Sequence, residues 1–213
     1  LELVRKHKAR MVHVSTDEVY GHLGKSDPPF TEDSPLSPRS PYSATKAGSD
    51  LLVQSYITTF GVDASITRCC NNYGPRQHDE KLIPTVIRSI VQGNKVPVYG
   101  NGKNIREWIH AEDHAKAIIE VLKDDVPAVV YNIVGNLVVD NLDLIKKVIK
   151  EIEHQFPGYK RKKSDYLEYV PDRKGHDFKY QLSSKHKLNA VEKQAKFNLS
   201  PTVKYYVEKY RAS

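Results

Sequence analysis

The sequence has few cysteines and no long apolar segment. Its only two cysteines, Cys69 and Cys70, are neighbours. Adjacent cysteines rarely bridge, so the sequence excludes a disulfide framework and favours a reducing compartment, for which we predict the cytoplasm. No apolar run approaches the roughly 18 to 20 residues of a membrane-spanning helix. Residues 1–10 are charged, unlike a secretory signal peptide. We therefore expect a soluble protein with no membrane partner.

A glycine-rich nucleotide-binding turn is also missing. None of the 11 glycines follows an N-terminal strand in the pattern with which dinucleotide-binding folds begin. The chain opens with Leu-Glu-Leu-Val, without methionine, in what resembles the end of a helix. We expect a fragment of a longer protein that lacks roughly 80 to 100 N-terminal residues, at about 30 residues per βαβ unit.

The charge balance is basic, with 33 Lys and Arg against 26 Asp and Glu. A net charge of +7 suits an anionic partner such as a phosphate, a nucleotide or a nucleic acid. The densest run, residues 160–163, is typical of a solvated surface stretch. Because no aromatic stacking platform accompanies this run, nucleic-acid binding is the weakest alternative, and we predict none.

Strand-like and helix-like segments alternate along the chain. Strands are expected at 10–15, 62–69, 96–99 and 129–134, and helices at 1–8, 41–60, 81–92, 110–123 and 141–154. The alternation predicts an α/β fold with a Rossmann-like, doubly wound parallel sheet that is incomplete at its N-terminal side. Ser40-Pro41 supplies a helix start, and Gly61 supplies the matching stop.

Polar groups follow the first strand directly, as Ser15-Thr16-Asp17-Glu18. Two adjacent carboxylates repel each other, so packing alone gives little reason for them at a strand end. In open α/β sheets, ligands bind at the carboxyl ends of the strands. The run therefore indicates a site that needs proton donors and acceptors.

Tyr42 and Lys46 stand four residues apart on the next predicted helix and so share one face. A lysine ammonium beside a phenol lowers the pKa of the tyrosine and makes it a plausible base. In isolation, a tyrosine packed on a lysine stem is the better interpretation. The position of the pair after the strand that ends in Asp17-Glu18 favours a catalytic interpretation, because we expect the tyrosine–lysine pair and the two acids to face the same crevice.

Seven segments together carry a family resemblance: VSTDEVYG, SPYSATKAGSD, TRCCNNYGP, EKLIP, PVYGNGKNIREWIHAEDHA, YNIVG and DRKGHD, in this order. They resemble the sugar-nucleotide branch of the extended short-chain dehydrogenase/reductase family, and within it most closely the dTDP-glucose 4,6-dehydratases. The resemblance covers about residues 10 to 180. The adjacent Asp17-Glu18 pair sets the dehydratases apart from related UDP-glucuronate decarboxylases and 4-epimerases.

The resemblance implies an NAD-dependent lyase that converts a nucleoside-diphosphate hexose, dTDP-glucose, to its 4-keto-6-deoxy sugar in deoxysugar biosynthesis. Tyr42, assisted by Lys46, would take the proton of the C4 hydroxyl while hydride passes to NAD+. Thr16 would hydrogen-bond the C4 oxygen. Glu18 would remove the C5 proton, and a protonated Asp17 would give its proton to the departing C6 hydroxyl. Hydride then returns to C6.

Binding positions follow from the same resemblance. Tyr42, Lys46 and Asn72 would contact NAD. Residues 81–86 would hold the diphosphate with backbone amides and a cation, residues 97–99 would line the base pocket, and Arg106 would fork to phosphate oxygens. The residues implied for the substrate are Thr16, Asn71, Lys81, Leu82, Ile83, Pro84, Thr85, Val86, Pro97, Val98, Tyr99, Arg106, Asn141, Asp172, Arg173, Lys174, Gly175 and His176. Judged singly, Asn71 and Arg106 are more typical of structural residues.

Beyond Gly158 the sequence is more polar, which predicts a smaller appended lobe, and the resemblance implies a homodimer. We expect residues 1–157 to form a partial Rossmann-like core with the catalytic motifs and interleaved sugar-nucleotide segments. Residues 158–213 would complete a smaller C-terminal α/β substrate lobe. Relatives dimerise through two helices per subunit, here residues 1–8 and 43–60.

Several alternatives stay open. The chain could be a non-catalytic sugar-nucleotide-binding remnant, or a related NAD-dependent epimerase or decarboxylase. His110 and His114 are spaced as zinc ligands can be, but the glutamate beside the first histidine and a third ligand are lacking, so we predict no metal.

Overall fold

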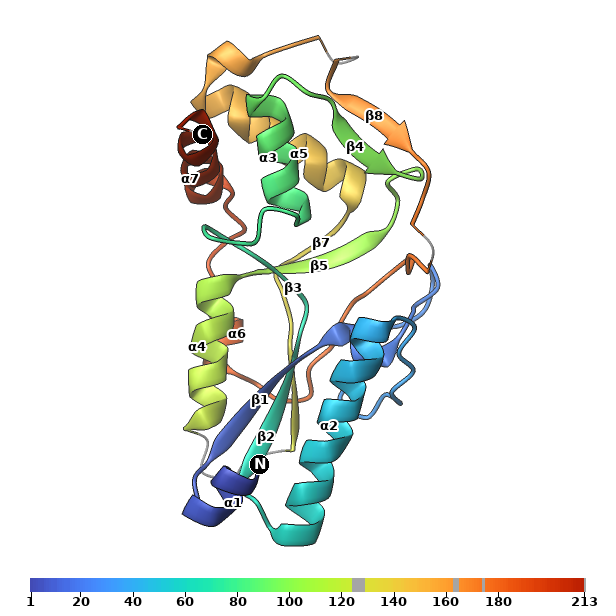
Figure 1. Cartoon of the computed structure of the whole chain (residues 1–213), viewed down its shortest axis with the longest axis vertical. Coiled ribbons are helices and arrows are strands. Elements are labelled where there is room, and N and C mark those ends of the chain that lie inside the picture. Colours follow the sequence, from blue (N-terminus) through green and yellow to red (C-terminus); the bar gives the residue numbers. More distant parts are fainter. Residues whose placement is uncertain (124–128, 163–164, 174, 213) are drawn as a thin grey trace. The chain divides into compact units, whose positions relative to one another are not determined.

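The computed structural model describes residues 1–123, 129–162, 165–173 and 175–212, which fall into two compact units (Figure 1). The first unit contains residues 1–72, 106–138 and 177–195, and the second contains 73–105, 139–176 and 196–213. Each unit is described below by itself. The predicted partition into residues 1–157 and 158–213 is a different one and remains a prediction.

The first unit is built on a parallel sheet with the strand order β1-β2-β6. Its strands are β1 (Met11–Thr16), β2 (Ala64–Cys69) and β6 (Val130–Ile133). Met11 pairs with Ala64, and Thr16 pairs with Cys69, so β1 and β2 end at the same edge. Every residue of β2 is buried, as expected for the central strand of a parallel sheet.

Helices cover this sheet on both sides (Figure 1). They are α1 (Glu2–His7), α2 (Pro41–Phe60) and α4 (Ala111–Leu122), and shorter elements are η1 (Asp17–Tyr20) and α6 (Asn189–Glu192). The predicted ends of α2 are confirmed: Ser40 accepts a hydrogen bond from Ser43 N at 3.1 Å in a capping box, and Gly61 ends the helix at φ 62°.

A buried ion pair ties α2 to the sheet. Asp50 on α2 is fully buried, and its Oδ2 accepts from Arg68 Nε of β2 at 2.9 Å. His13 Nε2 of β1 lies 3.2 Å from the other carboxylate oxygen. Burial raises the pKa of Asp50, but hydrogen bonds from His13, Ser15 and Arg68 outweigh it and lower the pKa. Asp50 therefore stays ionised inside the unit.

The second unit joins a two-stranded parallel sheet to three helices. The strands are β4 (Val96–Tyr99) and β8 (Leu167–Val170), and the helices are α3 (Leu82–Val91), α5 (Asn141–Gln155) and α7 (Ser200–Arg211), with a short turn η2 (Pro157–Tyr159). Fully buried aliphatic residues of all three helices, such as Val86, Val148 and Val207, form its core.

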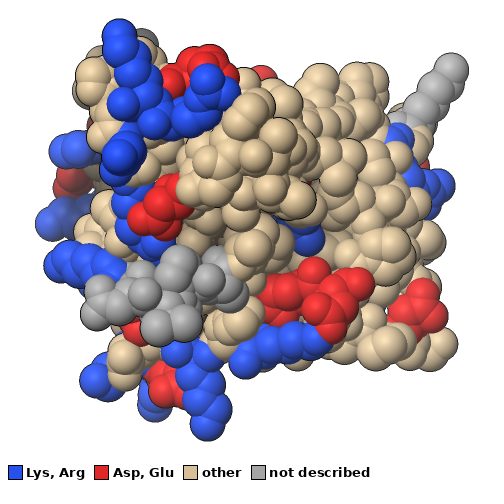
Figure 2. Space-filling view, turned by 90° about the horizontal axis from the view of Figure 1, so that it is seen from below, with Lys and Arg blue, Asp and Glu red and all other residues tan. Residues whose placement is uncertain are grey.

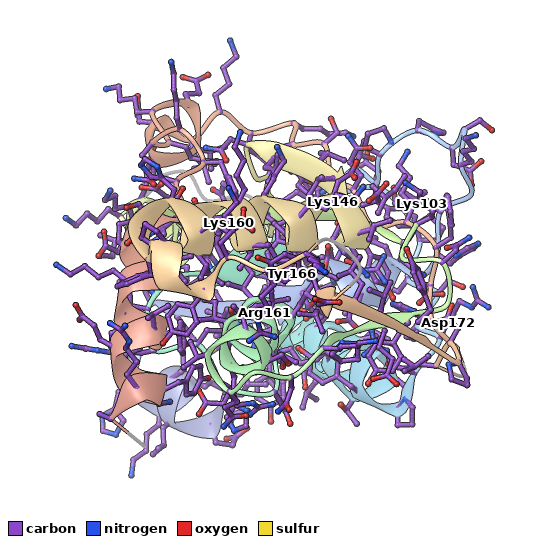
Figure 3. The ribbon with its side chains drawn as sticks, turned by 90° about the horizontal axis from the view of Figure 1, so that it is seen from above. Lys103, Lys146, Lys160, Arg161, Tyr166 and Asp172 are labelled. Atoms are coloured by element: carbon purple, nitrogen blue, oxygen red, sulfur yellow. The ribbon has the colours of Figure 1, made fainter. Side chains whose placement is uncertain are left out.

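Part of the basic run at 160–163 has a structural role. The Arg161 guanidinium donates to Ile90 O at 2.6 Å and to Asn94 O at 3.3 Å, near the end of α3. Arg161 N also donates to the Tyr166 hydroxyl at 2.7 Å, and the two side chains lie together in Figure 3. This arginine therefore satisfies carbonyls that the helix end leaves open.

Three further strands, in the order β3-β5-β7, contain three of the five points where the chain passes from one unit to the other. They are β3 (Asn71–Tyr73), β5 (Ile105–His110) and β7 (Leu137–Asp140). Together with the parallel strands of both units they confirm the predicted α/β class. Among the described residues, no helix combines the length and apolar character needed to cross a membrane.

On the face drawn in Figure 2, most Lys and Arg side chains lie toward the left of the view, and Asp and Glu side chains lie beside several of them. A broad area in the middle of this view carries neither.

Replacing Asp50 by alanine is expected to lower the free energy of unfolding by roughly 3–5 kcal/mol, because the Arg68 charge would stay buried without its partner. Urea unfolding of the full-length protein measures the change. The matched control is Asp63→Ala, which breaks the more exposed pair of Asp63 with Arg10 and should cost less than about 1 kcal/mol. Equal losses in the two variants would contradict the prediction.

Candidate functional site

The acid pair lies where β1 turns into η1. Thr16 caps this turn: its Oγ1 accepts from Glu18 N at 3.3 Å and donates to Asp17 Oδ1 at 3.2 Å. Asp17 is 2% exposed, whereas Glu18 is half-buried. The two neighbouring carboxyl groups therefore occupy different environments.

The environment of Asp17 favours its protonated form. Burial raises its pKa well above the ordinary value of 3.8, and the charges of Cys69, Glu18 and Glu107 raise it further, against a hydrogen bond from Thr16. Its Oδ2 is buried with no hydrogen-bond partner among the described residues. A neutral carboxyl group at this position is a proton donor.

Tyr42 converges on the same strand end. It lies in the first turn of α2 with 54% of its surface exposed. Burial and the charge of Glu18 raise its pKa, and a hydrogen bond with Thr16 acts in the opposite direction. The phenol therefore lies within interaction range of Thr16 and the acid pair, as expected for residues that share one site.

The predicted effect of Lys46 on Tyr42 is corrected by the structure. We expected the ammonium to lower the pKa of Tyr42, but that pKa is raised. Lys46 Nζ instead donates to Val14 O of β1 at 2.7 Å. The shared helix face is confirmed by this contact, since Lys46 reaches the same strand that carries Thr16.

Glu107 is a buried acid that sequence reasoning missed. It lies on β5, is 3% exposed, and accepts hydrogen bonds from Gly135 N at 2.7 Å and Leu182 N at 2.8 Å. Burial raises its pKa to about 7 although the two backbone hydrogen bonds lower it. The available signal was its place between Ile105 and Ile109, which share its face of the strand.

A second missed group surrounds Asn72. Its amide donates to Cys69 Sγ at 3.6 Å and to Cys70 O at 3.3 Å, and its Oδ1 lies 3.0 Å from His114 Nδ1. Burial raises the pKa of Cys69, but hydrogen bonds from Cys70 and His114 lower it overall. The predicted contact of Asn72 with NAD stays a prediction. In the structure, the Asn72 side chain contacts Cys69, Cys70 and His114 of the first unit.

Arg106 is buried rather than presented to solvent. Its guanidinium donates to Asp177 O at 2.8 Å and Phe178 O at 3.3 Å, and it stacks over the Tyr180 ring at 4.4 Å. These contacts match the structural interpretation of Arg106 taken singly. Its fork to phosphate remains a prediction, as does the substrate contact of the half-buried Asn71.

In the second unit, the predicted diphosphate segment opens α3. Lys81 is the exposed N-cap residue, and Leu82 is half-buried. Three of the predicted contact residues, Ile83, Pro84 and Val86, have buried side chains in the core of the unit. The predicted diphosphate contact of this segment, through the Lys81 ammonium and backbone amides, remains a prediction. Thr85 Oγ1 donates to Asp79 O at 3.2 Å.

The predicted base-pocket strand and closing segment lie together. Arg173 stacks over the Tyr99 ring at 5.1 Å, and its Nη2 lies 3.0 Å from His176 Nε2. His176 Nδ1 lies 2.6 Å from Asp172 Oδ1, and this hydrogen bond lowers the pKa of Asp172. Asp172 is labelled at the end of β8 in Figure 3.

The remaining predicted substrate residues vary in exposure. Pro97 is half-buried and Val98 is 1% exposed, so Val98 belongs to the core. Asn141 begins α5, and its backbone N donates to Asn104 O at 3.0 Å. Gly175 is exposed with φ 71°. Lys174 lies outside the described residues.

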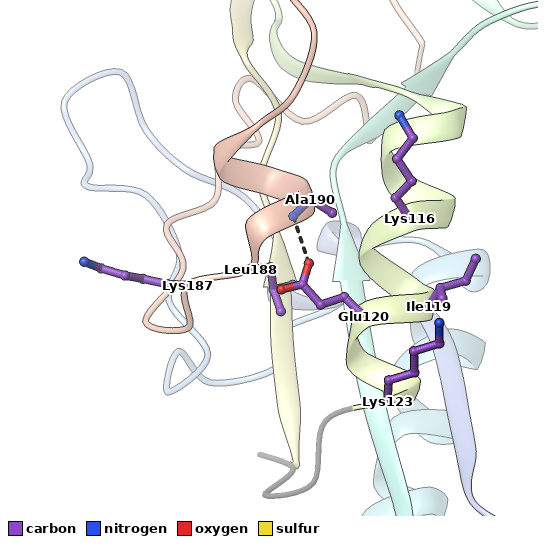
Figure 4. A pocket seen from close by; sticks show the side chains of 7 residues that line it. All are labelled: Lys116, Ile119, Glu120, Lys123, Lys187, Leu188 and Ala190. Carbon is purple, nitrogen blue, oxygen red and sulfur yellow. Dashed lines mark hydrogen bonds between the residues drawn. The ribbon is translucent and has the colours of Figure 1, made fainter.

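A pocket of about 510 Å³ between α4 and α6 contains none of the predicted residues (Figure 4). Its central acid, Glu120, caps α6 by accepting from Ala190 N at 2.8 Å. Lys116 pairs with Asp113 at 2.8 Å, and Lys187 extends away from the other two lysines in Figure 4. Without convergent polar groups, this pocket is not the candidate site.

The two histidines considered as zinc ligands have other partners. His110 accepts from Glu112 N at 3.3 Å as the N-cap of α4, and His114 contacts Asn72. Within the described parts of the chain, no group of three or more His, Cys, Asp or Glu side chains could hold a metal ion.

Comparison with known proteins identifies the family. The model of the family described as GDP-mannose 4,6 dehydratase matches residues 1–198. The chain belongs to this family. The resemblance to nucleotide-sugar 4,6-dehydratases predicted from the motifs is thereby confirmed.

Individual relatives of this dehydratase family agree. The chain is 42% identical over 214 residues to a dTDP-glucose 4,6-dehydratase from Haemophilus influenzae, covering 97% of the chain and 63% of that protein. It is 44% identical over 201 residues to the low-salt glycan biosynthesis protein Agl12 of Haloferax volcanii, covering 93% and 62%. The chain thus spans less than two thirds of the length of these relatives.

A solved dehydratase confirms the Rossmann-like fold. The structure of DesIV, a dTDP-glucose 4,6-dehydratase from Streptomyces venezuelae with NAD and TYD bound, matches with a TM-score of 0.87 at 38% identity. The match covers 99% of the chain and 64% of DesIV.

The raised pKa of Asp17 makes the stability of the fold depend on pH. An acid with a raised pKa in the folded state contributes most below its unfolded-state pKa, and this contribution falls as the pH rises toward the folded-state pKa. Asp17→Asn should therefore unfold at a higher temperature than the unaltered protein at about pH 7, and at a similar temperature near pH 4. If Asp17→Asn and the unaltered protein had the same unfolding midpoint at pH 7 as well as at pH 4, the prediction would be contradicted.

Proposed function

We propose that the full-length protein is an NAD-dependent lyase that dehydrates dTDP-glucose to its 4-keto-6-deoxy sugar. The observation that carries the proposal is the convergence of Tyr42, Thr16 and the acid pair at one strand end. Membership of the dehydratase family and the activity of a relative at 42% identity support the same reaction.

Each residue of the first unit has one chemical task in this reaction. Tyr42 takes the proton of the C4 hydroxyl, whose oxygen Thr16 holds by a hydrogen bond. The C4 ketone acidifies the C5 proton, which Glu18 removes as base. Asp17, kept neutral by burial, gives its proton to the C6 hydroxyl, which leaves as water. Adjacent carboxyl groups whose pKa values are pushed apart can divide acid and base roles in this way.

NAD fits part of the first unit. Lys46 and Tyr42 lie on one face of α2 beside β1, and the exposed Tyr42 hydroxyl faces the strand end where dinucleotide folds place ligands. Lys46, Tyr42 and Asn72 would hold the cofactor. NAD+, when bound, would accept the hydride from C4 and return it to C6, and Glu18 would give the proton that it removed back to C5.

Recognition of the nucleotide is proposed for the second unit. Lys81 and the first-turn amides of α3 offer positive charge to the diphosphate. The exposed ring of Tyr99, with Arg173 stacked on it, offers a surface for the base. Asp172 and His176 are held to this group by their hydrogen bond.

Turnover separates this function from the alternatives. A remnant that binds sugar nucleotides would hold dTDP-glucose without converting it, and an epimerase would return a hexose that keeps its C6 hydroxyl. Absorbance of the 4-keto-6-deoxy product in alkali, with dTDP-glucose and NAD+ added to the full-length protein, distinguishes the dehydratase from the other two, and recovery of an altered or unaltered hexose separates the epimerase from the remnant.

Replacing Glu18 by glutamine is expected to lower turnover by roughly 10²- to 10⁴-fold, because no base removes the C5 proton. Oxidation at C4 does not need Glu18, so quenched reactions should contain a 4-keto hexose that retains its C6 hydroxyl, detectable by mass spectrometry. Tyr42→Phe should lose turnover without this species. Accumulation of the undehydrated ketone in both variants, or in neither, would contradict the assigned roles.

We also infer a homodimer in the cytoplasm. Large apolar side chains are exposed on α1 and α2: Leu3 at 72%, Leu51 at 56%, Leu52 at 53% and Phe60 at 49%. Exposed apolar residues gathered on neighbouring helices are typical of an interface between subunits. The two cysteines are buried and free, which suits a reducing compartment.

Leu52→Lys should shift the full-length protein from dimer to monomer in sedimentation experiments, because a charge would have to be buried at the interface. The control is Ile119→Lys, which alters a residue of α4 with 49% exposure and should leave the dimer intact. A dimer that persists in Leu52→Lys, or an unaltered protein that sediments as a monomer, would remove this interface.

A further inference from the structure

Asp177 is a buried carboxylate in contact with both ends of the loop that connects the acid pair to Tyr42. This loop runs from Gly21, which ends η1, to Arg39, which precedes the N-cap of α2. Asp177 is 6% exposed. Its Oδ1 lies 2.8 Å from Arg39 Nη1 and 3.6 Å from His22 Nδ1.

Asp177 is itself fixed from the other side. The Tyr180 hydroxyl donates to its Oδ2, and Arg106 donates to its backbone carbonyl at 2.8 Å. The Arg106 guanidinium also covers the Tyr180 ring at 4.4 Å. The carboxylate is therefore held at both oxygens and cannot move without disturbing β5.

The residues that follow Asp177 form further hydrogen bonds with the same loop. Leu23 N donates to Lys179 O at 3.2 Å, and Phe30 N donates to Gln181 O at 3.0 Å. The loop also folds back on its own start: Gly21 has φ 92°, and a Cβ there would lie 2.3 Å from Ser37 O. The loop that connects the acid pair to Tyr42 is thus fixed by hydrogen bonds to residues 177–181.

Electrostatics place this group near the acid pair. Burial and the hydrogen bond to Asp177 raise the pKa of Tyr180, and the charges of Asp177 and Glu18 raise it further. Tyr180 therefore remains a neutral phenol that can donate to Asp177. Glu18 lies close enough to act on both Tyr180 and Arg106.

We propose that Asp177 is a positioning residue that fixes Glu18 relative to Tyr42 and so couples oxidation of the sugar at C4 to loss of its C6 hydroxyl. The inference rests on the proposed function. The base and the phenol belong to different elements, and the loop that joins these elements contributes to their separation, beside the contacts of α2 with β1 and β2. A misplacement of about 1 Å between reacting groups can cost 10²-fold in rate.

The test uses Asp177→Asn in the full-length enzyme with NAD, which removes the carboxylate charge that pairs with Arg39. We expect kcat for the 4-keto-6-deoxy product to fall roughly 10- to 100-fold, with KM for dTDP-glucose changed less than about threefold. In single turnovers, the undehydrated 4-keto hexose should accumulate relative to product. We call the ratio of undehydrated 4-keto hexose to 4-keto-6-deoxy product the partition. Partial unfolding would reduce the amount of active enzyme but would not change this partition.

A second variant guards against loss of the fold. Arg39 is about half exposed, with 49% of its side chain accessible, so Arg39→Gln spares the core and should give the same partition as Asp177→Asn. The control is Asp63→Asn, which weakens an Arg–Asp pair elsewhere in the first unit and should leave the partition unchanged.

The outcomes separate the two proposals. A partition in Asp177→Asn and Arg39→Gln equal to that of the unaltered enzyme overturns the positioning role and leaves the proposed function intact. Absence of turnover in the unaltered enzyme overturns the proposed function and this inference with it.

Discussion

The buried pair of Asp50 and Arg68 is the constraint on which the geometry of the first unit depends. Asp50 stands two turns beyond Tyr42 and one beyond Lys46, so all three lie on one stripe of α2. Arg68 anchors this stripe to β2 and also stacks over the Tyr20 ring of η1 at 4.7 Å. One guanidinium therefore contacts both the helix that carries the phenol and the turn that carries the acids.

The division of roles between Asp17 and Glu18 follows from what lies behind them. Asp17 faces an interior that already contains Glu107 and Cys69, and each added negative charge there makes its ionisation costlier. Glu18, one residue on, is half-buried. The turn at Thr16 therefore places two adjacent carboxyl groups in different environments, which suits the acid and base roles proposed for them.

The helix ends of the first unit could be predicted from the local sequence. The partners of its buried charged residues could not, because they lie far away in the sequence. Ser40-Pro41 and Gly61 predicted the ends of α2 because helix caps are local. Strand β5 was missed because Arg106 and Glu107 suggest a surface, while their partners lie at residues 177 to 182. The pKa of Tyr42 was predicted in the wrong direction because spacing does not reveal that Lys46 bonds Val14.

Helix α7 of the second unit lies beyond the residues that the family model matches, yet it contacts the segment before the proposed diphosphate site. The family model stops at residue 198, whereas α7 begins at Ser200. Yet α7 holds the segment before Lys81: Tyr206 donates to Gln77 O, while Lys209 and Tyr210 bind Asp79 at 2.7 and 2.8 Å. Arg76, just before this segment, has φ 67°, a conformation that persists only where the surroundings fix it. The position of the proposed diphosphate site thus depends on a helix outside the matched motifs.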